Sequence, residues 1–67
     1  MSEAAKLIVD GYVRLKDRDA LQEMREHRQM LRRNLQEKAG GAIDLSQSIQ
    51  MMDGDLNEIE AGLARLQ

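Results

Sequence analysis

The chain has 67 residues, a formal net charge of −2, one histidine, one aromatic residue (Tyr12) and neither cysteine nor proline. A domain this short buries only about 60% of its unfolded surface, and small folds usually add disulfides, a metal or oligomerisation. Disulfides are excluded here, and a single imidazole without any thiolate argues against structural zinc. We therefore expect close helix packing, self-association or both to hold the fold together.

Leu, Met, Ala, Glu, Gln and Arg dominate the composition, and all are good helix formers. This predicts a single all-α domain over residues 1–67. No run approaches the roughly 18 apolar residues of a membrane span, and Glu3 precedes a short mixed segment unlike a signal peptide. The expected location is the cytoplasm, with no membrane as partner.

Residues 3–16 are predicted to form the first helix. Their apolar side chains cover about 240° of the helix circumference, far more than one neighbouring helix buries. The hairpin predicted below covers one side, and the simplest second cover is another copy of the chain. We expect a homodimer with Ile8, Tyr12, Val13 and Leu15 in its interface. The pattern leaves open whether this helix packs on its own chain or swaps to a neighbour.

The second helix is predicted over residues 20–39. Asp19 with Gln22 three residues later resembles a capping box, and Lys38 before Gly40-Gly41 marks the end. Residues 16–19 form the expected joint to the first helix. One uninterrupted helix over 3–39 is an alternative, because nothing in the joint forbids helix.

Residues 40–43 are predicted to form the turn of a helical hairpin. A phosphate-binding loop would follow a strand and precede a helix start that tolerates anions. Gly40-Gly41 instead follows a helix, and Asp44 would repel a phosphate from the next one. The glycines are therefore interpreted as a plain turn.

The third helix is predicted over residues 45–66 and has the clearest pattern. Its apolar residues follow an unbroken 4,3 spacing, which is typical of a coiled-coil seam. Asp44 is the expected cap, and the seam keeps its phase through Gly54, so we expect one continuous helix. The residues of the seam are Leu45, Ile49, Met52, Leu56, Ile59, Leu63 and Leu66.

Folding the chain at the turn gives an antiparallel hairpin in which apolar side chains oppose one another. The predicted pairs are Leu35 with Ile49, Leu31 with Met52, Met24 with Ile59 and Leu21 with Leu63. Arg28 is the exception, and it falls beside Asp55. We expect its guanidinium to reach that carboxylate while its stem covers Leu56.

No group of residues suggests catalysis or ligand binding. His27 has only Glu23 at helical spacing, and acids two residues apart, such as Asp53 and Asp55, point to different sides of a helix. The sequence therefore predicts a protein that is not an enzyme and has no metal, cofactor or small-molecule substrate.

Arg25, Arg28, Arg32 and Arg33 give the second helix a basic face. This face could bind structured RNA or DNA through shape and phosphates. Residues 20–43 hold five Arg or Lys against three Glu, whereas residues 44–67 hold one Arg against five acids. The favoured interpretation is that a basic and an acidic helix pair within the chain, with nucleic acid as the less favoured partner.

Met30 and Met51 lie off the seams and could form a protein-binding patch, or fill the edges of a core or dimer interface. The expected plan is a short N-terminal helix followed by a long antiparallel hairpin, assembling as a dimeric bundle. In length and architecture it is similar to dimeric helical-hairpin regulators of the Rop type. The favoured function is a small interaction or regulatory module; a phage or plasmid assembly component is a further alternative.

Overall fold

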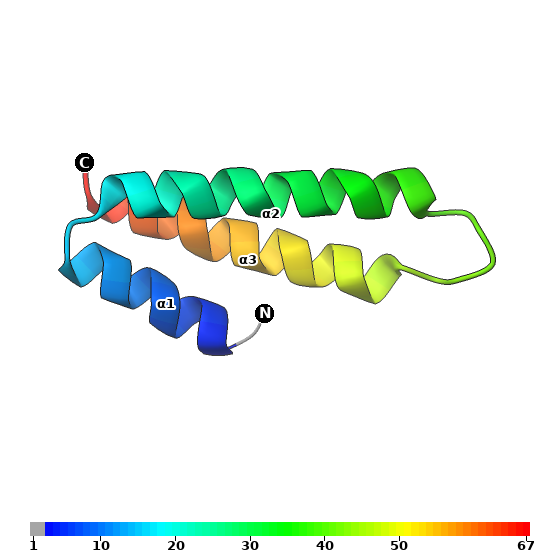
Figure 1. Cartoon of the computed structure of the whole chain (residues 1–67). Helices are drawn as coiled ribbons and strands as arrows, with labels where there is room; N and C mark the ends of the chain where they lie inside the picture. The colour runs from blue at the N-terminus through cyan, green and yellow to red at the C-terminus, as the bar shows by residue number, and fades with distance from the viewer. Residues whose placement is uncertain (1–2) are drawn as a thin grey trace.

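The computed structural model describes residues 3–67, which form three α-helices: α1 (Glu3–Arg14), α2 (Arg18–Lys38) and α3 (Ser46–Arg65). Figure 1 shows α2 and α3 as a long antiparallel hairpin, with α1 along the half that lies nearer the C-terminus. The predicted all-α class and the helical hairpin are confirmed. None of the three helices is long and apolar enough to cross a membrane.

The joint between α1 and α2 is a defined break and not a continuous helix. Lys16 adopts a left-handed φ of 54°. Its N–H donates to the Val13 carbonyl at 3.0 Å, and the Asp17 N–H donates to the Tyr12 carbonyl at 2.9 Å. This is the hydrogen-bond pattern of a Schellman helix end. The alternative of one helix over 3–39 is therefore wrong.

Asp17 then starts α2, two residues before the predicted cap. Its Oδ1 accepts a hydrogen bond from the Ala20 N–H at 3.0 Å, which satisfies one of the free donors of the first turn. Asp19 lies inside the first turn, where a carboxylate still interacts favourably with the helix dipole.

The turn of the hairpin runs between Ala39 and Leu45, and Gly40 has a φ of 92° that favours glycine. Asp44 accepts from the Ser46 N–H at 2.9 Å, although Leu45 occupies the cap position of α3. Beyond this start, α3 continues without a break through Gly54, as predicted.

The core lies at the end of the hairpin that α1 covers. Its buried residues are Val9, Leu21, Ile59 and Leu63. Tyr12, Val13, Met24 and Leu66 pack against them. Two of the predicted pairs, Met24 with Ile59 and Leu21 with Leu63, lie within this cluster.

The half of the hairpin next to the turn has only two helices. Leu31 is 37% exposed there, and Leu35, Ile49 and Met52 are only partly buried. With 12 residues, α1 is about 18 Å long, whereas the 21 residues of α2 span about 31 Å. Because α1 stops short, the apolar layers predicted for this half stay open on one side.

Candidate functional site

Three arginines of α2 form ion pairs with acids of α3. Arg25 Nη1 lies 3.2 Å from Glu60 Oε1, and Arg28 Nε lies 3.4 Å from Asp55 Oδ2. Arg32 Nε donates to Asp53 Oδ1. This hydrogen bond and the charge of Asp53 raise the pKa of Arg32 above its ordinary value. The structure thus brings the basic face and the acidic helix together within one chain.

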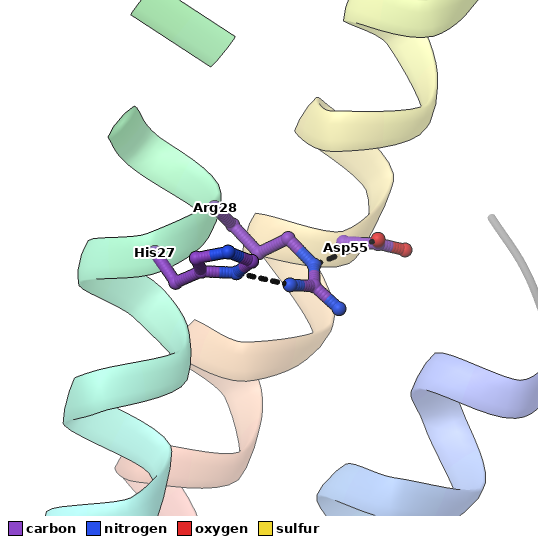
Figure 2. Close-up of polar contacts among 3 residues, drawn as sticks. All are labelled: His27, Arg28 and Asp55. Atoms are coloured by element: carbon purple, nitrogen blue, oxygen red, sulfur yellow. Dashed lines mark hydrogen bonds and ion pairs between the residues drawn. The ribbon is translucent and has the colours of Figure 1, made fainter. Parts of the chain in front are cut away.

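Arg28 and Asp55 form the most buried of these pairs. The Asp55 side chain is only 7% exposed and that of Arg28 is 23% exposed. In Figure 2 the guanidinium extends from α2 towards α3, with the His27 ring on one side and the Asp55 carboxylate on the other. His27 Nδ1 lies 2.7 Å from Arg28 Nη1, so it accepts from the guanidinium. The predicted contact between Arg28 and Asp55 is confirmed.

The ion pairs leave two buried polar atoms without a hydrogen-bond partner among the described residues. They are Asp55 Oδ1 and Arg25 Nε. An incompletely satisfied buried carboxylate costs stability, because its desolvation is only partly offset by one long contact. The Arg28–Asp55 pair is therefore better suited to fixing the alignment of α2 and α3 than to adding net stability.

The basic face predicted for nucleic acid is largely engaged inside the molecule. Arg25, Arg28 and Arg32 each contact an acid of α3. Arg33 is exposed and forms no ion pair with any residue of the described part. Phosphates would have to compete with Glu60, Asp55 and Asp53 for the other three guanidinium groups.

The helix α1 has a buried apolar face and further apolar side chains that are exposed. Ala5 and Val9 are buried against the hairpin, and Tyr12 and Val13 are partly buried on the same side, against the core. Other apolar side chains of this segment are exposed. They include two residues of the predicted interface, Ile8 at 46% on the side towards α2 and Leu15 at 75% just after the end of α1, together with Leu7 at 68%.

An apolar groove lies between α2 and α3 near the turn, in the half that α1 does not cover. Its volume is about 380 Å³. It is lined by Leu31, Asn34, Leu35, Lys38, Ser48, Met51 and Met52. Met51 is 48% exposed at this site, whereas Met30, 58% exposed, does not line it. The two methionines of the predicted patch therefore do not share this groove.

A second groove, of about 350 Å³, lies between α1 and α2 and includes His27. Glu23 and Arg28 are its charged residues, and Ile8, Tyr12, Ala20 and Met24 complete the lining. Over residues 3–67 no three His, Asp or Glu side chains are grouped so that they could hold a metal ion. The features that stand out are thus the charge pairing within the hairpin and the uncovered apolar surfaces.

Some important residues were not identified from the sequence. Gly62 lies where α1 crosses α3, and Asp10 pairs with Arg65 at 3.2 Å to tie these helices together. Gly62 could have been noticed, because a glycine inside a helix lowers helix stability and often indicates close packing against another element. The Asp10–Arg65 contact had no such signal, because it depends on how α1 crosses the hairpin.

Comparison of this chain with protein-family models, with curated proteins and with solved structures finds no match.

Proposed function

We propose that the protein is a small non-catalytic interaction module that acts by helix–helix recognition and self-associates through α1. The observation that carries this proposal is the exposure of Leu7, Ile8 and Leu15 in and just after a helix that already buries Ala5 and Val9 against the hairpin. Exposed large apolar side chains that gather within one short segment favour an interaction site. Burying one such side chain fully contributes about 1.5–3 kcal/mol.

The charge pairs of the hairpin support a role in recognition and not in chemistry. Arg25–Glu60, Arg28–Asp55 and Arg32–Asp53 hold α2 and α3 in one alignment, and so present the apolar surfaces in a fixed arrangement. A regulatory role through a protein partner, and a cytoplasmic location, stay predictions that accompany this proposal. Nucleic-acid binding has less support, because the same three arginines already have acidic partners.

Sedimentation equilibrium at tens of micromolar tests the proposal. The wild-type chain is expected to sediment as a dimer, and Ile8→Gln/Leu15→Gln is expected to be monomeric with an unchanged circular dichroism spectrum. Met30→Gln is the matched control, because Met30 is a similarly exposed apolar residue on α2. A wild-type chain that is monomeric and still unfolds cooperatively would overturn the proposal.

A further inference from the structure

The open groove lies on the same side of the hairpin as α1, and it is nearer the turn. Residues seven apart in a helix lie on nearly the same side, two turns apart. On α3, Gly62 faces Val9 of α1, and Ser48, two such steps earlier, lines the groove. On α2, Met24 lines the groove shared with α1, and Leu31 lines the open one. The hairpin therefore has room for a third helix over its full length, and α1 occupies only half.

The exposed face of α1 matches the open groove in length and character. The eight-residue step from Leu7 to Leu15 spans about 12 Å of helix, and the step from Leu31 to Lys38 spans about 10 Å. Leu7 and Leu15 are more than half exposed, and the lining of the groove is mainly apolar, so neither surface is covered by another described residue. Each could serve as the cover of the other, but not within one chain, because α1 is held by the short joint at the opposite end of the hairpin.

We propose that two copies of the chain dock reciprocally, with the exposed face of each α1 seated in the open groove of the other copy. This inference rests on the proposed self-association and names its receiving surface. A two-fold axis across the middle of the hairpin places the two α1 helices end to end between two hairpins. Each α1 is then covered by its own hairpin on one side and by the second hairpin on the other, and each hairpin has a third helix along both halves.

The direction of docking follows from the topology. Within one chain α1 runs parallel to α3 and antiparallel to α2 (Figure 1). The two-fold axis reverses the direction of α1, so the docked α1 of the second copy runs parallel to α2 of the first. Leu7 of the second copy then lies near Leu31, and its Leu15 lies near Lys38 and Ser48 at the turn end of the groove.

The surface area of the chain is consistent with a missing partner. A compact monomer of 7.6 kDa is expected to expose about 4,300 Å². This chain exposes 4868 Å², which is larger by about 600 Å². A standard interface buries about 800 Å² on each partner. The excess is about three quarters of this value, and reciprocal docking uses two patches of each chain to reach it.

Disulfide trapping tests the docking, because the chain has no cysteine of its own. Leu15→Cys and Ser48→Cys are made in separate chains, mixed in equal amounts and oxidised. Glu37→Cys, an exposed position near the turn end of α2 that does not line the groove, replaces Ser48→Cys as the matched control. The Leu15–Ser48 disulfide is expected to exceed the Leu15–Glu37 product by about tenfold or more, since docking raises the local thiol concentration towards millimolar. Circular dichroism of each variant verifies that the helices remain.

The outcomes separate this inference from the proposed function. If Leu15→Cys couples mainly to itself while the wild type is dimeric, the α1 helices pair with each other and the groove is not the receiving surface. Equal trapping at Ser48 and Glu37 also overturns the docking. A wild-type monomer in sedimentation overturns the proposed self-association and the docking together.

Discussion

Val9 packs directly on the backbone of Gly62, and a Cβ added to this glycine would lie 2.6 Å from Val9 Cγ1 and 3.3 Å from Val13 Cγ2. Real Cβ atoms essentially never come so close to another heavy atom as the first of these distances. Gly62 therefore sets how near α1 and α3 approach, and its lack of a side chain is what lets Val9 be fully buried.

Gly62→Ala is expected to destabilise the protein. Overpacking of this kind costs about 1–3 kcal/mol, and the better helix propensity of Ala returns about 1 kcal/mol. A net loss of up to about 2 kcal/mol should appear in urea unfolding. Gly11→Ala is the matched control, because its added Cβ would meet nothing within 4 Å. Measured at concentrations where the chain is monomeric, this control should gain stability.

A double-mutant cycle decides whether the clash with Val9 is the cause. Val9→Ala removes the Cγ1 atom and costs stability by itself, but it also makes room for the new Cβ. The double variant should therefore lose less than the sum of the two single losses, by at least about 0.5 kcal/mol. Strict additivity would contradict the close contact between α1 and α3.

Removing one partner of the Arg28–Asp55 pair is expected to lower the free energy of unfolding strongly. Replacing both partners with apolar residues is expected to change it little. Arg28→Met leaves the buried Asp55 carboxylate without its cation and should reduce the free energy of unfolding by up to about 3 kcal/mol. Arg28→Met/Asp55→Leu removes both charges, and its stability should return close to that of the wild type. Urea unfolding of the three proteins provides the comparison.

Arg25→Met is the control for this prediction. Its partner Glu60 is half exposed, so the loss should stay within about 1 kcal/mol. If Arg28→Met were no more harmful than Arg25→Met, the assignment of Arg28–Asp55 as the buried, alignment-fixing contact would be contradicted.

The hairpin and its alignment could be predicted from the sequence because their determinants are local and periodic. The 4,3 spacing of the third helix and the glycines at the turn fix which faces meet, and that alignment already places Arg28 beside Asp55. It also places Arg25 near Glu60 and Arg32 near Asp53, contacts that the charge distribution indicated only in aggregate.

The arrangement of α1 could not be predicted in the same way. Its apolar residues were visible as a wide arc, but the sequence does not show which part of the arc meets the hairpin. In the structure Val9 faces the core and Leu15 does not, because the crossing point is set by Gly62. The open groove near the turn likewise follows from the position of α1 relative to α2, which no local pattern encodes.

Lys16 provides a prediction about the joint between α1 and α2. A non-glycine residue with a φ of 54° bears a cost that glycine does not. Lys16→Gly should therefore stabilise the protein by roughly 0.5–1 kcal/mol, although the greater freedom of glycine in the unfolded chain offsets part of the gain. Arg14→Gly, in the last turn of α1, should instead lose about 1 kcal/mol. Equal effects of the two changes would contradict the helix end at this joint.

Asp44 gives the start of α3 a dependence on pH. Its carboxylate accepts hydrogen bonds from the backbone N–H and the side chain of Ser46, and these lower the pKa of Asp44 below the ordinary value of 3.8. Because the folded pKa is the lower one, this stabilisation is present above the ordinary value and is lost as the pH falls through the folded pKa.

Asp44→Asn keeps an acceptor oxygen and does not titrate. The difference in unfolding free energy between wild type and Asp44→Asn should therefore be constant near neutral pH and shift against the wild type in acid. Since all other carboxylates are common to both proteins, a difference that stays constant down to about pH 2 would show that the Asp44 contact with Ser46 does not form in solution.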